Sequence, residues 1–157
     1  MFYVICHNIR SLYNIGSIFR TADAFGVDKI FLTGYTGTPK NPRLKKTSLG
    51  AEKTVKWEYQ KQLRRVIDKL KREGFKIVAL ENNTAGTIPI DKFQASHPIA
   101  LLLGEEVKGI KPNYLKLCDE IVEIPMQGKK ESLNVGVAAG IAMYHIAKSK
   151  IKNQNAK

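Results

Sequence analysis

Polar side chains that could do chemistry stand in the stretch 124–145, IPMQGKKESLNVGVAAGIAMYH. Ser132 and Asn134 lie in a short polar loop, directly behind two lysines and ahead of a nearly all-apolar segment. A serine there suits the N-cap of a helix, where its hydroxyl satisfies a free backbone N–H. Asn134 would then lie inside the first turn, where a polar side chain is mildly unfavourable unless it has a partner.

Arg20 lies in a segment whose apolar residues recur at helical spacing, and it falls on the face opposite to them. That apolar stripe consists of Ile15, Ile18, Ala22 and Phe25. One interpretation is a solvated arginine on an exposed helix face. The other is a guanidinium close to the end of the preceding strand, where it could grip a phosphate through paired hydrogen bonds.

Glu105 and Glu106 follow a leucine run and a glycine, at the end of an expected strand. Paired carboxylates can serve as general acid and base, and in a basic protein they also form salt bridges. A Ser-His-Asp hydrolase is poorly supported, because no GxSxG accompanies the three histidines, which are expected to be structural or solvated. The GxxxxGK[ST] and GxGxxG signatures of nucleotide-binding loops are also missing.

The charge is the unusual feature of an otherwise ordinary globular composition. The 157 residues suit one compact domain, and 26 Lys+Arg against 14 Asp+Glu give a net charge of +12. This balance favours a polyanionic partner such as nucleic acid, although a solvated lysine-rich surface has the same composition. Cys6 and Cys118 predict reduced, buried thiols rather than a disulfide. We expect no metal site and no membrane span, since the apolar-rich run 133–147 is too short for one, and hence a soluble cytoplasmic protein.

Apolar runs alternate with helix-forming segments, which predicts an α/β sheet with crossover connections. Strands are expected at 2–9, 29–35, 76–82, 98–104 and 120–126. Helices are expected from an Asn14 N-cap to Gly26, over 60–74, after Pro112 and over 132–148. Residues 36–56 predict a long functional surface loop with one short helix. Because ligands bind beyond the carboxyl ends of parallel strands, the loops after the three later strands are the first candidates for a site.

Three segments together resemble the TrmH (SpoU) branch of the SPOUT RNA methyltransferases, in that family's order. NIGSIFRTADAFGV is similar to its first motif, LLLGEEVKGI to its second, and IPMQGKKESLNVGVAAGIAMYH to its third. The resemblance covers about residues 3–147. Two positions depart from it: Gly136 stands where many relatives have a second serine, and Glu105 stands where a small residue is commoner.

The resemblance implies a single methyltransferase domain over residues 1–150, followed by a polar basic tail, 151–157. Its fold would be a mostly parallel sheet with helices on both faces and a C-terminal trefoil knot, an exception to the rule against knotted chains. The family also implies a homodimer that binds S-adenosyl-methionine and transfers its methyl group to a ribose 2′-hydroxyl of RNA.

Site residues follow from the resemblance by position. The cofactor pocket would be lined by Leu80, Gly104, Ile124, Met126 and Leu133. Catalytic and substrate-binding roles would fall to Arg20, Asn14, Glu106, Ser132 and Asn134. The family gives proton acceptance to the arginine, but arginine stays protonated in proteins, so a phosphate or a water is the alternative acceptor.

RNA would then bind the basic surface of the catalytic domain, since we expect a minimal enzyme without an added RNA-binding domain. Contacts to phosphates are expected from Arg10, Lys40, Arg43, Lys45, Lys46, Lys53 and Lys129. Minimal relatives often act on tRNA, which favours tRNA slightly over ribosomal RNA. Two alternatives stay open: a catalytically silent RNA-binding homologue, and a nucleotide-binding hydrolase or phosphotransferase.

Overall fold

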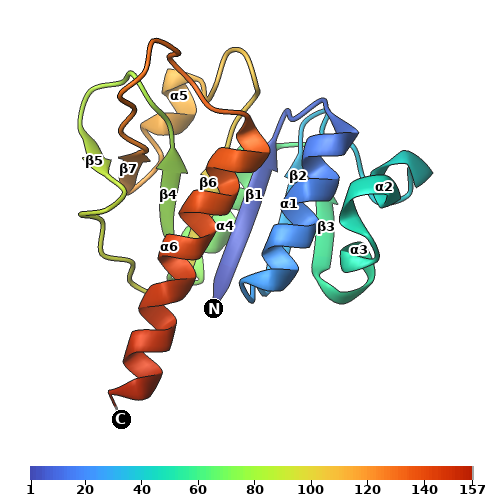
Figure 1. Ribbon diagram of the computed structural model, residues 1–157, viewed down its shortest axis with the longest axis horizontal. Coiled ribbons are helices and arrows are strands. Elements are labelled where there is room, and N and C mark those ends of the chain that lie inside the picture. The colour runs from blue at the N-terminus through green and yellow to red at the C-terminus, as the bar shows by residue number, and fades with distance from the viewer. Residues whose placement is uncertain (157) are drawn as a thin grey trace.

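The computed structural model describes residues 1–156, apart from the side chains of 152–154, and shows a sheet with helices on both faces (Figure 1). The sheet has seven strands in the order β3-β2-β1-β6-β4-β7-β5, and the paired strands run parallel. The predicted mostly parallel α/β sheet is therefore confirmed. The strands are β1 Phe2–His7, β2 Lys29–Thr33, β3 Lys56–Gln60, β4 Lys76–Leu80, β5 Thr87–Pro89, β6 Ile99–Leu103 and β7 Glu120–Glu123. The helices are α1 Leu12–Ala24, the short 3-10 turn η1 Pro42–Leu44, α2 Lys45–Ser48, α3 Ala51–Thr54, α4 Leu63–Arg72, α5 Pro112–Leu115 and α6 Val135–Asn155.

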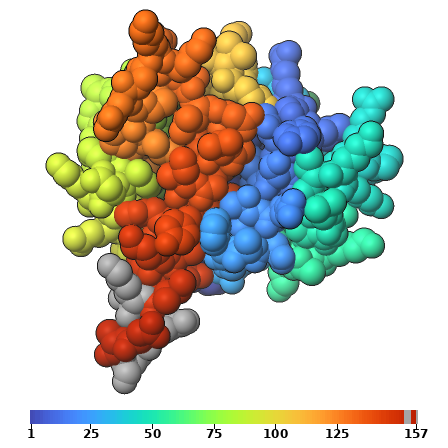
Figure 2. Space-filling model, in the orientation of Figure 1, coloured from blue at the N-terminus to red at the C-terminus, as the bar shows by residue number. Residues whose placement is uncertain are grey.

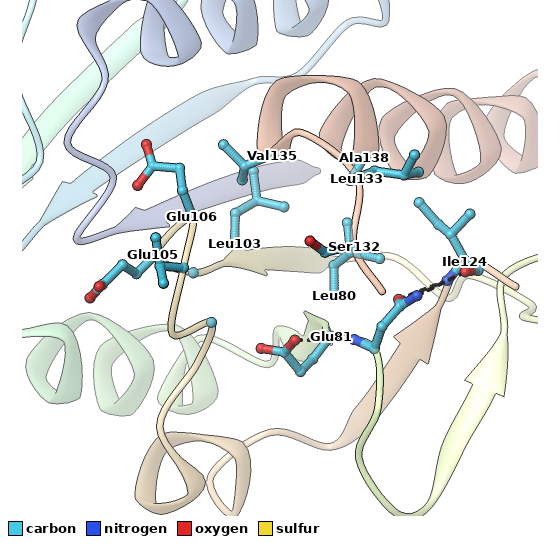
Figure 3. A pocket seen from close by; sticks show the side chains of 14 residues that line it. Leu80, Glu81, Leu103, Glu105, Glu106, Ile124, Ser132, Leu133, Val135 and Ala138 are labelled. Carbon is cyan, nitrogen blue, oxygen red and sulfur yellow. Dashed lines mark hydrogen bonds between the residues drawn. The ribbon is translucent and has the colours of Figure 1, made fainter. Parts of the chain in front are cut away.

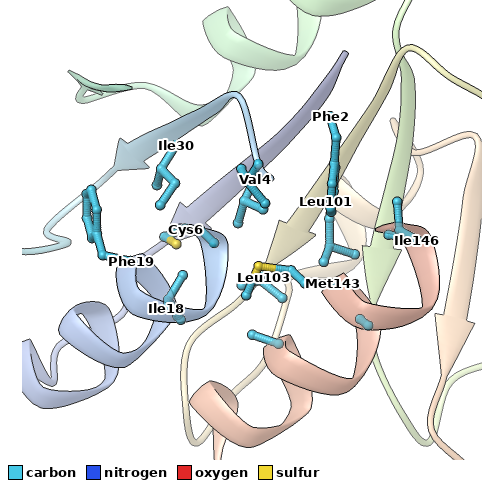
Figure 4. Packing of buried hydrophobic residues seen from close by; sticks show 14 of the residues in the cluster. Phe2, Val4, Cys6, Ile18, Phe19, Ile30, Leu101, Leu103, Met143 and Ile146 are labelled. Carbon is cyan, nitrogen blue, oxygen red and sulfur yellow. The ribbon is translucent and has the colours of Figure 1, made fainter. Parts of the chain in front are cut away.

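Alternation along the strands divides the core into two layers. Phe2, Val4 and Cys6 of β1 pack in the cluster that contains α1 and α6 (Figure 4), whereas Ile5 packs in the cluster that contains α4. Met143 of α6 lies fully buried in the first layer. Because a fully buried aliphatic or aromatic side chain contributes about 1.5–3 kcal/mol, these layers hold α1 and α6 firmly against one face of the sheet.

Helix α4 follows its sequence pattern closely. Leu63, Val66, Ile67 and Leu70 are all buried, at the predicted spacing of one helical face. The helix ends at Arg72, and Gly74 follows with φ +86, a conformation that glycine adopts without strain. The predicted amphipathic helix is thus confirmed, although it begins later than expected.

Two edge strands were not expected from the sequence. Strand β3 lies at one edge of the sheet, and none of its residues is fully buried, so it lacks a continuous apolar run. Strand β5, at the other edge, is three residues long and ends at Pro89. Neither strand has the strong apolar pattern by which central parallel strands are recognised.

The predicted loop 36–56 is more ordered than expected, because η1, α2 and α3 occupy most of it. Leu44, Ala51 and Val55 are buried against the core, so the basic residues around them project from a fixed surface. Gly16 of α1 makes this docking possible. A Cβ at Gly16 would lie 2.6 Å from the carbonyl oxygen of Leu44.

Helix ends differ from the predictions. Ser11, not Asn14, is the N-cap of α1, and its side chain accepts the backbone N–H of Asn14 at 3.1 Å. Helix α6 begins at Val135 rather than at 132 and continues to Asn155. No glycine or proline follows Gly140 to stop it, so much of the expected polar tail 151–157 is helical. Lys157 lies outside the described residues.

Both cysteines are free thiols, as predicted, but only Cys6 is buried, whereas Cys118 was expected to be buried and is half-buried. Burial raises the pKa of Cys6, and it raises that of the half-buried Cys118 to about 11. Both thiols are therefore protonated near neutral pH. Across residues 1–156, no helix combines the length and apolar character that a bilayer span requires.

Candidate active site

The loops after β4, β6 and β7 meet the first turn of α6 at the carboxyl edge of the sheet (Figure 1). A pocket lies among them (Figure 3). Its apolar walls are Leu80, Leu103, Val107, Ile124, Leu133, Val135 and Ala138. Its polar lining includes Glu81, Asn82, Glu105, Glu106 and Ser132. This is the place that a parallel sheet offers to ligands, and the three loops are those singled out from the sequence.

Glu106 connects this pocket to the N-terminus of α1. Its Oε1 accepts the backbone N–H of Ser11 at 3.2 Å and the side-chain amide of Asn14 at 3.4 Å. Its Oε2 accepts the backbone N–H of Arg10 at 3.4 Å. A carboxylate is favourable here because the N-terminal end of a helix carries partial positive charge. Neither Glu105 nor Glu106 forms a salt bridge among the described residues.

Asn134 joins the third motif to the first. Its Nδ2 donates to Oδ1 of Asn14 at 3.1 Å. Its own Oδ1 accepts the backbone N–H groups of Gly136 at 2.9 Å and Val137 at 3.2 Å. Asn134, not Ser132, therefore satisfies the free N–H groups at the start of α6. Asn14 thus bridges Glu106 and Asn134, which places residues of all three motifs in one hydrogen-bonded chain.

Ser132 is exposed and lines the pocket instead of capping the helix. Figure 3 shows its side chain among Leu80, Leu103 and Glu81. Because the cap belongs to Asn134, the Ser132 hydroxyl is not committed to the helix.

Arg20 is not part of this chain of side chains. It lies on α1 six residues after Asn14, which is about 9 Å along the axis and about 240° around it. The side chain is exposed, as predicted, and it makes no hydrogen bond or ion pair with any described residue. Within one chain, Asn14, Glu106, Ser132 and Asn134 come together and Arg20 stays apart.

Four of the five residues predicted for a cofactor line the pocket: Leu80, Gly104, Ile124 and Leu133. Met126 is half-buried and, in the described part of the chain, does not belong to the lining. Glycine is required at position 104 because the backbone of Gly109 and Ile110 approaches it closely. A Cβ there would lie 2.8 Å from the backbone carbon of Gly109 and 2.9 Å from the backbone nitrogen of Ile110.

Glu81 and Asn82 were not singled out from the sequence, yet they fix the pocket loops. Glu81 accepts the backbone N–H of Ile110 at 2.7 Å. Asn82 exchanges two hydrogen bonds with the backbone of Ile124, at 2.9 and 3.2 Å. The sequence feature that could have identified them is their position directly after the apolar run ending at Leu80, where a loop leaves the carboxyl edge of the sheet.

The departure at Gly136 also has a structural reason. A Cβ there would lie 3.1 Å from Oδ1 of Asn134 and 3.6 Å from Cβ of Ser17 on α1. Glycine therefore leaves room for the Asn134 cap and for the close approach of α1 and α6. At the other departure, Glu105 accepts a hydrogen bond from the Tyr35 hydroxyl at 2.8 Å.

The basic residues predicted to contact RNA are all exposed: Arg10, Lys40, Arg43, Lys45, Lys46, Lys53 and Lys129. Five of them lie between Lys40 and Lys53, on and around η1, α2 and α3. Arg10 precedes α1, and Lys129 lies in the loop between β7 and α6. In the part of the chain that the structure describes, no group of three or more His, Cys, Asp or Glu side chains could hold a metal ion.

Comparison with known proteins shows the family of this chain. Residues 1–144 match the model of the SpoU rRNA methylase family. The 23S rRNA (guanosine-2′-O-)-methyltransferase RlmB of Acinetobacter baylyi is 31% identical over 139 residues, which are 88% of this chain and 56% of that protein. The chain thus spans little more than half the length of this relative.

Solved structures agree with the family match. The A. aeolicus TrmH/SpoU tRNA modifying enzyme superposes with a TM-score of 0.88 and 27% identity, over 98% of this chain and 77% of that one. The SpoU methyltransferase AviRb from Streptomyces viridochromogenes, in complex with the cofactor AdoMet, gives a TM-score of 0.85 and 28% identity. That match covers 95% of this chain and 57% of the other.

Proposed function

Because the chain belongs to the SpoU rRNA methylase family, as its three motifs predicted, we propose that it transfers a methyl group from S-adenosyl-methionine to a ribose 2′-hydroxyl of RNA. One observation carries this proposal. Asn14, Glu106 and Asn134, from three separate motifs, form one hydrogen-bonded chain beside a pocket at the carboxyl edge of the sheet. The similarity to RlmB, whose name states guanosine-2′-O-methylation, supports the reaction.

The pocket suits S-adenosyl-methionine in its chemistry. Aliphatic walls from Leu80, Ile124 and Leu133 fit the adenosine and the carbon chains around the sulfonium, and polar loops around them offer backbone and side-chain hydrogen bonds. Gly104 keeps the wall formed by residues 104–110 tightly packed. When bound, S-adenosyl-methionine supplies a methyl group already activated by the positive sulfonium.

The chain's own residues then have to position a hydroxyl and remove its proton. A ribose hydroxyl is a weak nucleophile until its proton is drawn off, so orientation and deprotonation are the tasks left to the protein. We assign orientation of the substrate to Asn134, which Asn14 holds, and to the uncommitted hydroxyl of Ser132 in the pocket lining. Arg20 holds a substrate phosphate and stabilises the developing alkoxide, and that phosphate or a water takes the proton.

We further propose that the active form is a homodimer, in which the shared face of α1 and α6 is buried. Figure 2 shows α1 and α6 side by side on one surface of the molecule. Exposed apolar side chains follow one stripe of α6 at helical spacing: Val137, Ile141 and Tyr144. On α1, the exposed Tyr13 and Arg20 lie seven residues apart and so share a face. Burial of this face would bring Arg20 close to a second copy, which accounts for its distance from Asn14 within one chain.

The family resemblance also supports a trefoil knot formed by the C-terminal loops, which we include in the proposed fold. RNA would lie over the basic surface of η1, α2 and α3, and would be either tRNA or ribosomal RNA. A protein of this kind would act in the cytoplasm, where both RNAs are found.

The test is methyl transfer from labelled S-adenosyl-methionine to purified tRNA and to ribosomal RNA in parallel, with calorimetric binding of S-adenosyl-methionine alongside. Label in one pool supports the proposal and names the RNA class. Cofactor binding without transfer to either pool would point to another RNA. RNA binding without any cofactor binding would favour the catalytically silent RNA-binding homologue.

A further inference from the structure

A second hollow lies beside the pocket, between the loop after β2 and the edge strand β3. Tyr35 and Tyr59 line it, together with Lys40, Gly34, Gly37 and Pro42. Tyr35 is 48% exposed and Tyr59 is 45% exposed, so both present a large part of the side chain to solvent. Two exposed tyrosines in one hollow of a strongly basic protein call for an explanation beyond folding.

The hollow is held in place by hydrogen bonds. The Tyr59 hydroxyl donates to the carbonyl oxygen of Gly34 at 2.6 Å, and the backbone N–H of Tyr35 donates to Oδ1 of Asn8 at 3.1 Å. Gly34 has φ +65, and a Cβ there would collide with the Asn8 side chain. Thr36 is buried, and its hydroxyl accepts the backbone N–H of Ile9 at 3.1 Å. Tyr35 is therefore presented on a fixed loop and Tyr59 on the edge strand β3, before any ligand binds.

Tyr35 connects this hollow to the pocket. Its hydroxyl donates to Oε2 of Glu105 at 2.8 Å, and Glu105 belongs to the pocket lining. The guanidinium carbon of Arg10 lies 5.0 Å from the centre of the Tyr35 ring. Glu105, the residue that departs from the family pattern, thus has a specific partner in this chain.

Positive charge surrounds the hollow. Lys40 is part of its lining, Arg10 stacks on Tyr35, and the exposed Arg43 follows Pro42 directly. Aromatic rings next to cationic side chains are the recurrent means of holding unpaired nucleotides, because bases stack on the rings and phosphates meet the cations.

We propose that this hollow binds an unpaired nucleobase of the RNA strand, close to the nucleotide whose ribose enters the pocket. The inference rests on the proposed function and adds a substrate class to it: RNA that offers a single-stranded segment at the modified position. The Tyr35–Glu105 hydrogen bond fixes the distance between this base and the pocket.

The experiment measures binding of a short oligoadenylate that carries 2-aminopurine, whose fluorescence is quenched by stacking, to the full chain with S-adenosylhomocysteine present. Tyr35→Ala and Tyr59→Ala are each expected to weaken binding about tenfold or more and to reduce the quenching. Tyr35→Phe and Tyr59→Phe keep the rings but lose the hydroxyl hydrogen bonds, so each should weaken binding less than the corresponding alanine variant and should retain quenching. Lys76→Ala, which removes an exposed charge at the amino end of β4 and so at the other end of the parallel strands, is the control for general electrostatic loss.

Folding of each variant is checked by its affinity for S-adenosylhomocysteine, which should not change. Wild-type affinity and quenching in both alanine variants would overturn the inference. If Lys45→Ala and Lys46→Ala, outside the hollow, still weakened binding, RNA would use the basic surface without the hollow. Failure of the wild type to bind the oligoadenylate would also overturn it, even where methyl transfer to RNA is detected. Lack of transfer to any RNA, with tyrosine-dependent binding intact, would count against the proposed reaction alone.

Discussion

Asn134 donates a hydrogen bond to Asn14 at 3.1 Å, although the two asparagines are 120 residues apart in the chain. This contact connects the start of α6 to the first turn of α1. The side-chain amide of Asn14 in turn donates a hydrogen bond to Glu106. Side chains from all three motifs are thereby fixed relative to one another at one edge of the sheet. The active-site account depends on this connection.

Asn134 performs two tasks that substitution can separate. Asn134→Ala loses the helix cap and the Asn14 contact, so the free energy of unfolding should fall by about 1 kcal/mol and methyl transfer should be strongly reduced. Asn134→Ser keeps an oxygen that can cap α6 but lacks the amide donor. Urea denaturation should show near-normal stability for the serine variant, with methyl transfer still impaired. Full activity of Asn134→Ser would show that the contact to Asn14 is dispensable.

Glu106 should affect both stability and activity, because it holds the residues at the start of α1. Glu106→Ala removes the acceptor of the Ser11 N–H and of the Asn14 amide. The expected loss of stability is about 1–2 kcal/mol, because these groups are partly exposed and water replaces some of the lost contacts. Methyl transfer should fall far more than stability. Glu120→Gln, at the exposed start of β7, is the matched control and should leave both quantities unchanged.

The face shared by α1 and α6 should set the oligomeric state. Ile141 is 40% exposed in the single chain, in the stripe that contains Val137 and Tyr144. Ile141→Asp would place a charge in a buried contact, so light scattering after gel filtration should show a dimer for wild type and a monomer for the variant. Lys71→Asp, at an exposed position of α4 on the other face of the sheet, is the control and should leave the oligomeric state unchanged. A monomeric wild type would contradict the proposed dimer and the role given to Arg20 within it.

Stability should also depend on pH through two histidines. Burial lowers the pKa of His7, with the Lys111 charge adding to the effect, and burial also lowers the pKa of His97. The unfolded chain therefore binds more protons than the folded one as the pH falls through about 6.5, and stability declines there. Urea denaturation at a series of pH values should show this decline, and the double substitution His7→Gln, His97→Gln should flatten it. The pKa values of Glu52 and Glu58 are lowered, so protonation of these two carboxylates reduces stability only near or below pH 4.5.

Much of the fold was predictable because its signals are local. The central strands are continuous apolar runs, and α4 repeats its buried residues at helical spacing, so both can be recognised without a structure. The edge strands β3 and β5 lack such a pattern, since an edge strand is covered on fewer sides. Their pairing depends on neighbours that are distant in sequence.

The site shows the same division. Residue types at Asn14, Glu106 and Asn134 could be matched to a family, but their mutual hydrogen bonds depend on how the chain closes at one sheet edge. Asn134 rather than Ser132 caps α6 because the helix begins at Val135. Capping preferences alone do not decide at which residue a helix begins. Glu81 and Asn82 act on the backbone of other loops, and such contacts leave no spacing pattern in the sequence.

The central claim is tested most directly by locating the transferred methyl group. RNA methylated by the wild-type protein is digested to nucleosides and analysed by mass spectrometry, and Arg20→Ala is treated in the same way. We predict a nucleoside methylated on the ribose 2′-oxygen that is lost in Arg20→Ala, although the variant binds S-adenosyl-methionine normally. A methyl group on a base would contradict the proposed chemistry, and undiminished product from Arg20→Ala would contradict the role assigned to Arg20.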